Sequence, residues 1–133
     1  MASSTQAGTR STFNAEASTD LSGDANLGLA IALDANGDAI LAVDATGDDC
    51  IGPLYDGGRN AGDPVSVTVD GPALFAGGAA INEADMCRSH SDSEWRPIGA
   101  ADDNATCLAF QAGADGELFS GLVIHARGHA ATP

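Results

Sequence analysis

The sequence predicts an all-β fold, a small β-barrel or sandwich of about nine short strands with an extended N-terminal arm. Apolar residues alternate with small or polar ones in several segments, which is the period-two pattern of strands with one buried face. Turn-forming Gly, Asp, Asn and Pro recur about every ten residues, a spacing typical of barrels and sandwiches. No amphipathic pattern is long enough for more than about two helical turns.

The strands predicted from this alternation run over residues 27–33, 38–43, 49–55, 65–69, 86–89, 95–98, 105–111 and 117–127. Gly71-Pro72 is expected to bend the strand over 65–69 into a continuation over 73–75. The first two form a hairpin across Asn36-Gly37, a pair typical of the type I′ turn, in which both residues take positive φ. Pro53 indicates a sheet edge or a bulge in the third. The fourth is the clearest half-buried strand, because Val alternates with Ser, Thr and Asp along it. Residues 112–116 form the turn of the final hairpin.

One domain is the natural interpretation of 133 residues. We expect an extended arm over 1–12, which has no periodicity, a β domain over 13–127 and a C-terminal tail over 128–133. The segment 79–84 favours one short helical turn. With only six aromatic residues, the core must be built from Val, Leu, Ile and Ala, so we expect an oligomer that adds to its stability.

The charge balance is strongly acidic. Fifteen Asp and four Glu stand against five Arg and no Lys, which gives a formal net charge of −14. A compact chain with this charge repels itself in dilute salt, whereas roughly 1 M salt shortens the Debye length to about 3 Å and screens the repulsion. The composition therefore predicts a protein of concentrated brine. Codon bias in a GC-rich genome is the alternative explanation, but it would also raise the Arg content.

The same charge excludes two classes of partner. Nucleic-acid binding depends on Lys and Arg against phosphates, and five scattered arginines form no basic patch in the sequence. Anionic membranes are disfavoured for the same reason, and no stretch approaches the ~20 apolar residues of a membrane helix. Residues 1–18 have no apolar run, so we expect no secretion signal. The three cysteines are expected to be free and mostly buried, as in a protein made in a reducing cytoplasm.

Two sets of residues have the types that metals bind. Asp34-Ala35-Asn36-Gly37-Asp38 is similar to an acidic cation loop, but its Gly is fourth, where a calcium-binding EF-hand needs Gly at the sixth position. Cys87-x-x-His90 and His125-x-x-x-His129 have spacings that zinc accepts, although His129 lies in the expected tail. Solvated turns, exposed histidines and a buried thiol explain the same residues. We therefore predict no metal and no cofactor.

No catalytic constellation is recognisable, and we predict no enzymatic activity. The sequence has no Gly-x-Ser-x-Gly elbow, and its glycine-rich segment over 57–62 lacks the Lys and following helix of a phosphate-binding loop. Cys107 and His125 could be neighbours across the final hairpin. A pocket that joins these two side chains would be the sign of a small hydrolase.

The order of the segments is more specific than their type. The segments, in chain order, are Ile31–Val43, Cys50–Leu54, Ala61–Gly71, Ala76–Ile81, Cys107–Ala112 and Glu117–Ile124. This order resembles that of the small decoration (cement) proteins of tailed-virus capsids. In that family a segment like AGDPVSVTVDG precedes one like AGGAAI, and strands like CLAFQA and ELFSGLVI end the domain. The resemblance covers residues from about 13 to 127.

The resemblance implies a structural protein of the virion, a compact β-barrel on the outer surface of an icosahedral capsid. Such a protein assembles as a homotrimer, bridges neighbouring major capsid subunits and stabilises the particle. Combined with the charge, it indicates a virus of a halophilic archaeal host. The absence of Lys and the polar loop over 88–94 depart from the family pattern. Because the absence of Lys disfavours charge-driven docking, we expect apolar contact and backbone pairing instead.

The candidate interface combines an arm that could add to a sheet edge, with Phe13 as its apolar anchor, and an aromatic–basic pair of the kind enriched at binding hot spots. The residues are Thr9, Arg10, Ser11, Thr12, Phe13, Asn14, Ala15, Trp95 and Arg96. A disordered terminus is the alternative for the arm. A core position that closes one end of the barrel is the alternative for Trp95.

A ligand- or carbohydrate-binding β module of a halophile is the competing hypothesis. Such a module needs an aromatic platform, and six aromatic residues spread along the chain are poorly suited to form one. A monomer that binds glycans would favour this hypothesis. Copurification with virus particles, near stoichiometric with the shell, would favour the decoration protein.

Overall fold

The computed structural model of the chain describes residues 11–57, 61–99 and 104–126. The predicted all-β class is confirmed: these residues form nine strands and one short 3-10 turn, η1 (Asp24–Asn26). The strands are β1 (Ser11–Glu16), β2 (Ala30–Leu33), β3 (Ala39–Leu41), β4 (Gly52–Asp56), β5 (Pro64–Ala76), β6 (Met86–Ser89), β7 (Trp95–Pro97), β8 (Ala105–Ala109) and β9 (Leu118–Ala126). In the described part of the chain, no helix has the length and apolar character needed to cross a membrane.

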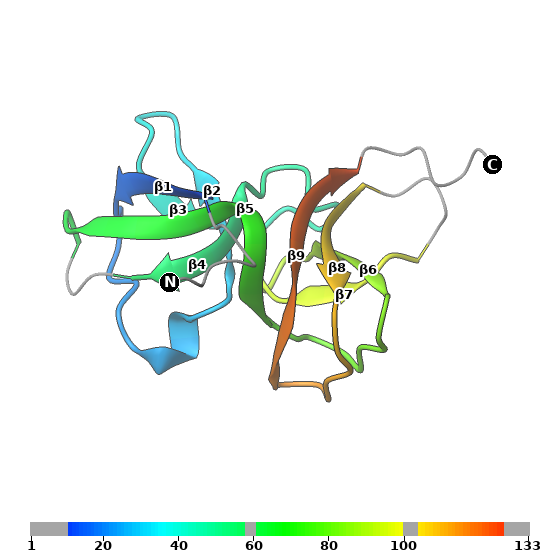
Figure 1. The fold of residues 1–133 in the computed structure, drawn as a ribbon. Coiled ribbons are helices and arrows are strands. Elements are labelled where there is room, and N and C mark those ends of the chain that lie inside the picture. Colours follow the sequence, from blue (N-terminus) through cyan, green and yellow to red (C-terminus); the bar gives the residue numbers. More distant parts are fainter. Residues whose placement is uncertain (1–10, 58–60, 100–103, 127–133) are drawn as a thin grey trace.

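All nine strands join one antiparallel, curled sheet in the order β3-β2-β4-β5-β9-β8-β6-β7, with β1 added beside β5. The long strand β5 is shared by two halves of the molecule. Its first part pairs with β1 and β4, and its second part, from Gly71 to Ala76, pairs with β9. Gly71 has a φ of 92° where the partner changes. Figure 1 shows β5 turning at this region from one half into the other, as the Gly71-Pro72 pair predicts.

Each half has its own apolar core. The larger core is built around Phe75, Trp95 and Phe119, and the smaller around Leu21, Leu54 and two valines of β5. Strand β2 contributes to both, with Ala30 and Ala32 in the larger core and Ile31 between them in the smaller one. The sequence predicted one buried face for this strand. Both faces are buried because Ala30 and Ala32 are small enough for the larger core to pack against them.

Two segments of the form Asp-Ala-x-Gly-Asp, residues 34–38 and 44–48, fold alike. The Gly37 N–H donates to the Asp34 carbonyl oxygen at 3.0 Å, and Asp34 Oδ1 accepts the Asn36 N–H at 2.8 Å; in the second segment both distances are 2.9 Å. Gly37 and Gly47 have φ values of 83° and 74°, whereas Asn36 is not among the described residues with positive φ. The predicted type I′ turn is therefore wrong. Because the Asp34 carboxylate orders the following amides, the chain forms a type I turn followed by a left-handed glycine.

The helical turn lies elsewhere than predicted. It is formed by residues 24–26, whereas the segment 79–84 contains a bend, an isolated β-bridge at Ile81 and a turn. The backbone of Ile81 exchanges two hydrogen bonds with Gly113, at 2.8 and 3.0 Å, which holds this part of the segment extended. A helix would break both bonds, so the long-range pairing overrides the local preference of these small residues.

Strand β1 begins within the segment expected to be an arm. Ser11 and Thr12 pair with Asp70 and Thr68 of β5, and Phe13 lies opposite Val67. This edge of β5 would otherwise be unpaired, because β4 occupies its other side and β9 pairs only from Gly71 onward. The ordered strand therefore extends at least to Ser11. Residues 1–10 and 127–133, which include most of the expected arm and the whole expected tail, lie outside the described residues.

Candidate docking groove

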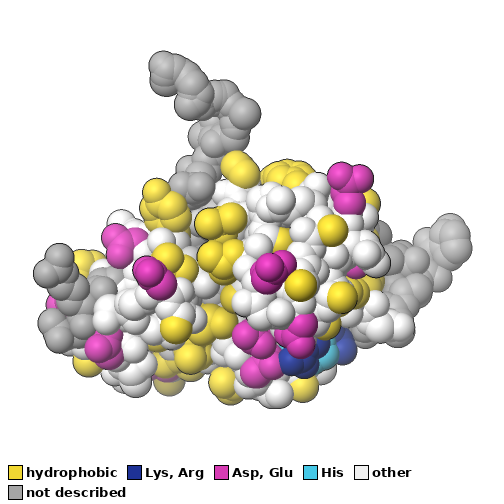
Figure 2. Space-filling model, turned by 90° about the horizontal axis from the view of Figure 1, so that it is seen from below, with side chains coloured by type: hydrophobic (Ala, Val, Ile, Leu, Met, Phe, Trp, Pro, Cys, Tyr) yellow, Lys and Arg dark blue, Asp and Glu magenta, His cyan; other side chains and the backbone are white. Residues whose placement is uncertain are grey.

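An apolar groove lies where the two halves of the molecule meet. Its volume is about 260 Å³, and it is lined by Leu27, Gly28, Leu54, Tyr55, Thr68, Ala73 and Leu74. The lining comes from the segment after η1, from β4 and from both parts of β5. In Figure 2, hydrophobic side chains run between the two halves and acidic side chains lie on both sides of them. This combination makes the groove the strongest candidate binding surface of the described residues.

Gly28 holds the two sides of the groove together. Its N–H donates to the Leu54 carbonyl oxygen at 3.1 Å, and its own carbonyl oxygen accepts the Ala76 N–H at 3.0 Å and the Trp95 indole N–H at 2.9 Å. Its φ is 78°, and a Cβ at this position would lie 2.9 Å from both the Ala76 nitrogen and Leu118 Cδ2. Only glycine permits this close approach without displacing a neighbour.

Large apolar side chains at the groove face solvent. Tyr55 and Leu74 are 51% and 53% exposed, and the nearby Leu118 is 45% exposed. None of the lining residues carries a formal charge at neutral pH, although the chain as a whole is strongly acidic. A contiguous exposed apolar surface of this kind is typical of sites that bind another macromolecule. The groove is thus suited to take up uncharged, apolar side chains.

One buried polar group lies at the groove. Thr68 is 1% exposed, and its hydroxyl oxygen has no hydrogen-bond partner among the described residues. Thr68 pairs with Thr12 of β1, which fixes its position in β5. An unsatisfied hydroxyl costs folding free energy, commonly about 1 to 3 kcal/mol. Thr68 is therefore a residue at which substitution by Val would relieve a cost to folding.

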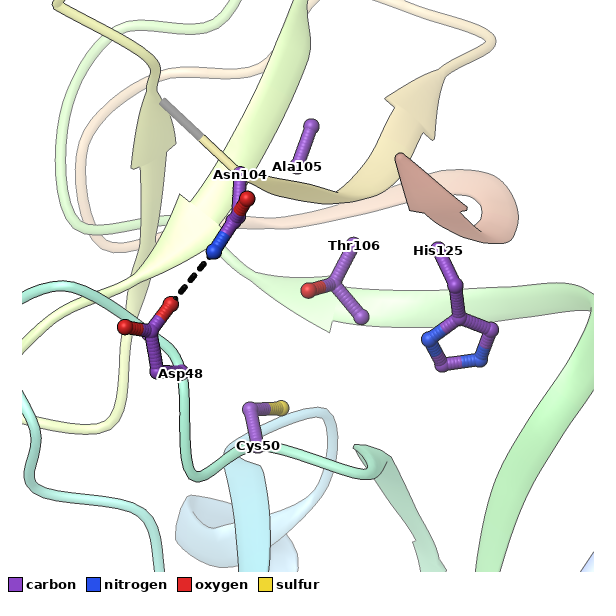
Figure 3. Close-up of a pocket in the computed structure, with 7 residues that line it drawn as sticks. Asp48, Cys50, Asn104, Ala105, Thr106 and His125 are labelled. Atoms are coloured by element: carbon purple, nitrogen blue, oxygen red, sulfur yellow. Dashed lines mark hydrogen bonds between the residues drawn. The ribbon is translucent and has the colours of Figure 1, made fainter. Parts of the chain in front are cut away.

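A second cavity brings together side chains of types that are used in catalysis, but its volume is only about 20 Å³. Figure 3 shows Asp48, Cys50, Thr106 and His125 around it, with Asn104 Nδ2 donating to Asp48 Oδ1 at 2.6 Å. This space holds about one water molecule and no organic substrate.

The thiol in this small cavity is poorly suited to act as a nucleophile. Burial raises the pKa of the Cys50 thiol to about 12, so the thiol stays protonated near neutral pH. His125 Nε2 lies 3.1 Å from the Val69 carbonyl oxygen, to which it can donate a hydrogen bond. Cys107 does not line this cavity with His125, since its side chain is fully buried in the larger core. The pocket that would indicate a hydrolase, one joining Cys107 and His125, does not appear at this site.

The residues considered for metal binding are dispersed or already engaged. No group of three or more His, Cys, Asp or Glu side chains in the described ranges could hold a metal ion. Cys87 is fully buried, and His129 lies outside the described residues. In the acidic turn, Asp34 Oδ1 accepts the N–H groups of Asn36 and Asp38, at 2.8 and 3.0 Å. This carboxylate oxygen thus stabilises the turn itself.

The candidate interface residues of the N-terminal segment lie partly in β1. Thr9 and Arg10 are outside the described residues, whereas Ser11, Thr12, Phe13, Asn14 and Ala15 pair with β5 of the same chain. Phe13 is 42% exposed, and Asn14 Oδ1 accepts a hydrogen bond from the Ser66 hydroxyl at 2.8 Å. The edge of β1 opposite β5 pairs with no other described strand.

Trp95 and Arg96 have different environments. Trp95 is 0% exposed, and its ring meets Phe75 edge-on with centroids 4.9 Å apart. Its side chain is therefore a core residue and does not reach the surface, which corrects its assignment to the interface. Arg96 is partly exposed, donates through Nε to the Gly78 carbonyl oxygen at 3.0 Å and forms an ion pair with Asp92. Arg96 thus braces the β6–β7 turn against the segment after β5.

The sequence did not indicate Tyr55 or Leu74 as binding residues. A usable signal was present at Leu74, because Leu74 and Phe75 are adjacent large apolar residues in a strand, and only one of them can face the core. Phe75 is fully buried and Leu74 is the exposed one. For Tyr55, the last position but one of β4, no comparable signal exists.

No family model matches this sequence, and no curated protein matches it. A solved structure does resemble the fold. It is the N base of the head fiber gp8.5 of bacteriophage phi29, with a TM-score of 0.59 over 90% of this chain and 98% of that chain. The two sequences are 15% identical. This similarity shows a shared fold.

Proposed function

We propose that the chain is a structural protein of a tailed-virus head, a decoration (cement) protein that binds the outer surface of the capsid. There it bridges neighbouring major capsid subunits and stabilises the particle, since a ligand that binds only the assembled shell favours assembly. The observation that carries the proposal is the fold shared with a phage head-fiber base over 90% of the chain. The order of the sequence segments supports it independently.

The groove between the two halves is the proposed contact with the capsid. Its occupant is an uncharged, apolar segment of the major capsid protein, because none of the residues that line the groove is charged, although the chain as a whole is strongly acidic. At roughly 1 M salt, exposed ion pairs are screened within about 3 Å, so apolar contact dominates the binding free energy. A homotrimer would present three such grooves and bind through multivalency.

The test is binding of the purified protein to particles of the virus that encodes it. Wild-type protein should sediment with particles near stoichiometrically with the shell. Leu74→Asp should reduce the affinity about tenfold or more, because it puts a charge into an apolar contact. At 53% exposure, Leu74 contributes little to folding, so the unfolding midpoint of this variant should change little.

Val43→Asp is the matched control, because Val43 is 61% exposed, does not line the groove and undergoes the same change of charge. Equal loss of binding in both variants would reject the groove as the contact. If wild-type protein does not bind particles but is a monomer that binds glycans on an array, the carbohydrate-binding alternative replaces the proposal.

A halophilic virus is the proposed source, and salt should stabilise the protein. Each described acidic residue is at least partly exposed, and the chain carries a formal charge of −14. Screening of this charge should raise the thermal unfolding midpoint between roughly 0.1 and 1 M NaCl, where the Debye length falls from about 10 to 3 Å.

The control for this salt effect is a triple variant, Asp24→Asn, Asp70→Asn and Asp115→Asn, in which three exposed charges are removed. Its midpoint should be higher at low salt and should rise less as salt is added. A wild-type midpoint that is independent of NaCl over this range would contradict adaptation to brine.

A further inference from the structure

Two cysteines face each other across neighbouring strands in the larger core. Cys87 of β6 lies directly opposite Cys107 of β8 in the antiparallel register, and both are 0% exposed. Directly opposed residues in an antiparallel pair have Cα atoms about 4.5 to 5.5 Å apart and side chains on the same face. A disulfide spans Cα separations of about 4.4 to 6.8 Å. The backbone thus already holds the two residues at a bridgeable separation.

The neighbourhood leaves space for sulfur at this position. Gly121 of β9 lies beside Cys107, and a Cβ at residue 121 would be 3.1 Å from both Cys107 Sγ and the Phe75 ring. The Cys87 thiol lies 4.0 Å from the Asp85 carbonyl oxygen, and the Cys107 thiol is in hydrogen-bond contact with the Cys87 thiol. The two sulfurs are therefore already neighbours in the core. The third cysteine, Cys50, lines the small cavity beside His125.

We propose that Cys87 and Cys107, free in the structure, form an intrachain disulfide when the protein meets an oxidising medium. With a low-molecular-weight disulfide as the oxidant, one protein thiolate attacks the oxidant and releases one small thiol, leaving a mixed disulfide. The second protein thiolate then attacks the protein sulfur and releases the second small thiol. Two protein thiols are oxidised, the oxidant is reduced to two thiols, and both protons pass to the medium or to the leaving thiolates.

The reaction is slow because the pair is buried. Burial and the neighbouring Cys87 thiol raise the pKa of the Cys107 thiol, which makes the reactive thiolate scarce in the closed fold. The oxidant reaches the pair when the end of the sheet opens, since β7 is the last strand of the sheet order and covers β6 alone. Oxidation therefore follows the rate of this local opening.

The disulfide ties β6 to β8 across the segment that contains β7. The closed loop runs from residue 87 to residue 107 and includes the turn after β6. A cross-link of this length restricts the unfolded chain and raises the midpoint of thermal unfolding by roughly 10 °C. A protein exported with a particle into an oxidising medium would gain this stability after its synthesis.

Trypsin digestion tests the proposal directly, because each cysteine falls in a different peptide. Cleavage after Arg10, Arg59, Arg88 and Arg127 gives peptides 11–59, 60–88 and 89–127, with the Arg96–Pro97 bond resistant. The full chain is incubated with oxidised glutathione, blocked with N-ethylmaleimide under denaturing conditions and digested. We expect peptides 60–88 and 89–127 to be linked, with a loss of 2 mass units that reduction reverses. The linkage should form several-fold faster in mild urea.

Cys50→Ser is the matched control and should give the same linked peptides, whereas Cys107→Ser should give none. The thermal midpoint of the oxidised Cys50→Ser protein, compared with its reduced form, reports the stabilisation. Fully alkylated Cys87 and Cys107 after prolonged oxidation in mild urea would overturn the proposal. A link from peptide 11–59 to either of the others in place of the expected one would overturn it equally.

Discussion

Trp95→Ala is expected to destabilise the folded state by about 3 to 5 kcal/mol. The indole is fully buried, meets the Phe75 ring at 87° and donates a hydrogen bond to the Gly28 carbonyl oxygen. Removing it leaves a cavity in the larger core and breaks the link to the groove. A total stability of about 5 to 15 kcal/mol is typical, so this single change removes much of it. Urea unfolding in roughly 2 M NaCl, where salt largely screens the repulsion between charges, measures the loss of free energy of unfolding.

Trp95→Phe separates the contribution of core packing from that of the hydrogen bond to Gly28. It keeps most of the aromatic volume but loses the indole N–H, and a single hydrogen bond contributes about 1 kcal/mol. The expected cost is therefore much smaller than that of the alanine variant. A Trp95→Ala protein that unfolds within about 1 kcal/mol of wild type would mean that the indole is not a core group. In that case the prediction that Trp95 is an interface residue would be supported again.

Gly52→Ala is expected to cost about 4 kcal/mol or more, a loss usually found only where a substitution forces the backbone apart. A Cβ at residue 52 would lie 1.9 Å from the Thr68 carbonyl oxygen, so β4 and β5 must separate. These two strands also line the groove through Tyr55 and Thr68. We therefore expect loss of particle binding together with a lower urea midpoint.

Gly37→Ala is the control for backbone strain without a clash. Gly37 also has a positive φ, 83°, but nothing lies within 4 Å of the position of its Cβ. A non-glycine residue in this conformation costs roughly 1 to 2 kcal/mol. Equal losses in the two variants would show that the packing of β4 against β5 is not the cause. A clearly larger loss for Gly52→Ala supports the close approach of the two strands.

The strands could be predicted because alternation and turn residues are local signals. The 86–89 strand has the predicted bounds, and most others differ by only a few residues at their ends. The side of each strand that is buried was harder to predict. The alternation in β2 predicted one buried face, yet Ala30 and Ala32 on the opposite face pack into the larger core. Small residues fit either environment, so their burial depends on a neighbour that the local sequence does not specify.

The groove could not be predicted for a related reason. Leu27, Tyr55 and Leu74 are distant in sequence, and they meet because β5 bends at Gly71 and Gly28 bonds to both sides. The Gly71-Pro72 pair indicated the bend in the sequence, but nothing in the sequence indicated which residues the bend brings together. Trp95 was predicted to lie at an interface because an aromatic residue beside an arginine has the composition of a binding hot spot. That composition is the same whether the aromatic side chain is buried or exposed.

Strand β5 has a mechanical consequence. Residues of this one strand complete both cores, with Val65 and Val67 in the smaller and Ala73 and Phe75 in the larger. Neither core remains intact once the strand is withdrawn, so the molecule should melt in one cooperative step with no half-folded state. Force applied to one half passes to the other along a continuous covalent backbone. Such a molecule is expected to unfold as one unit under load.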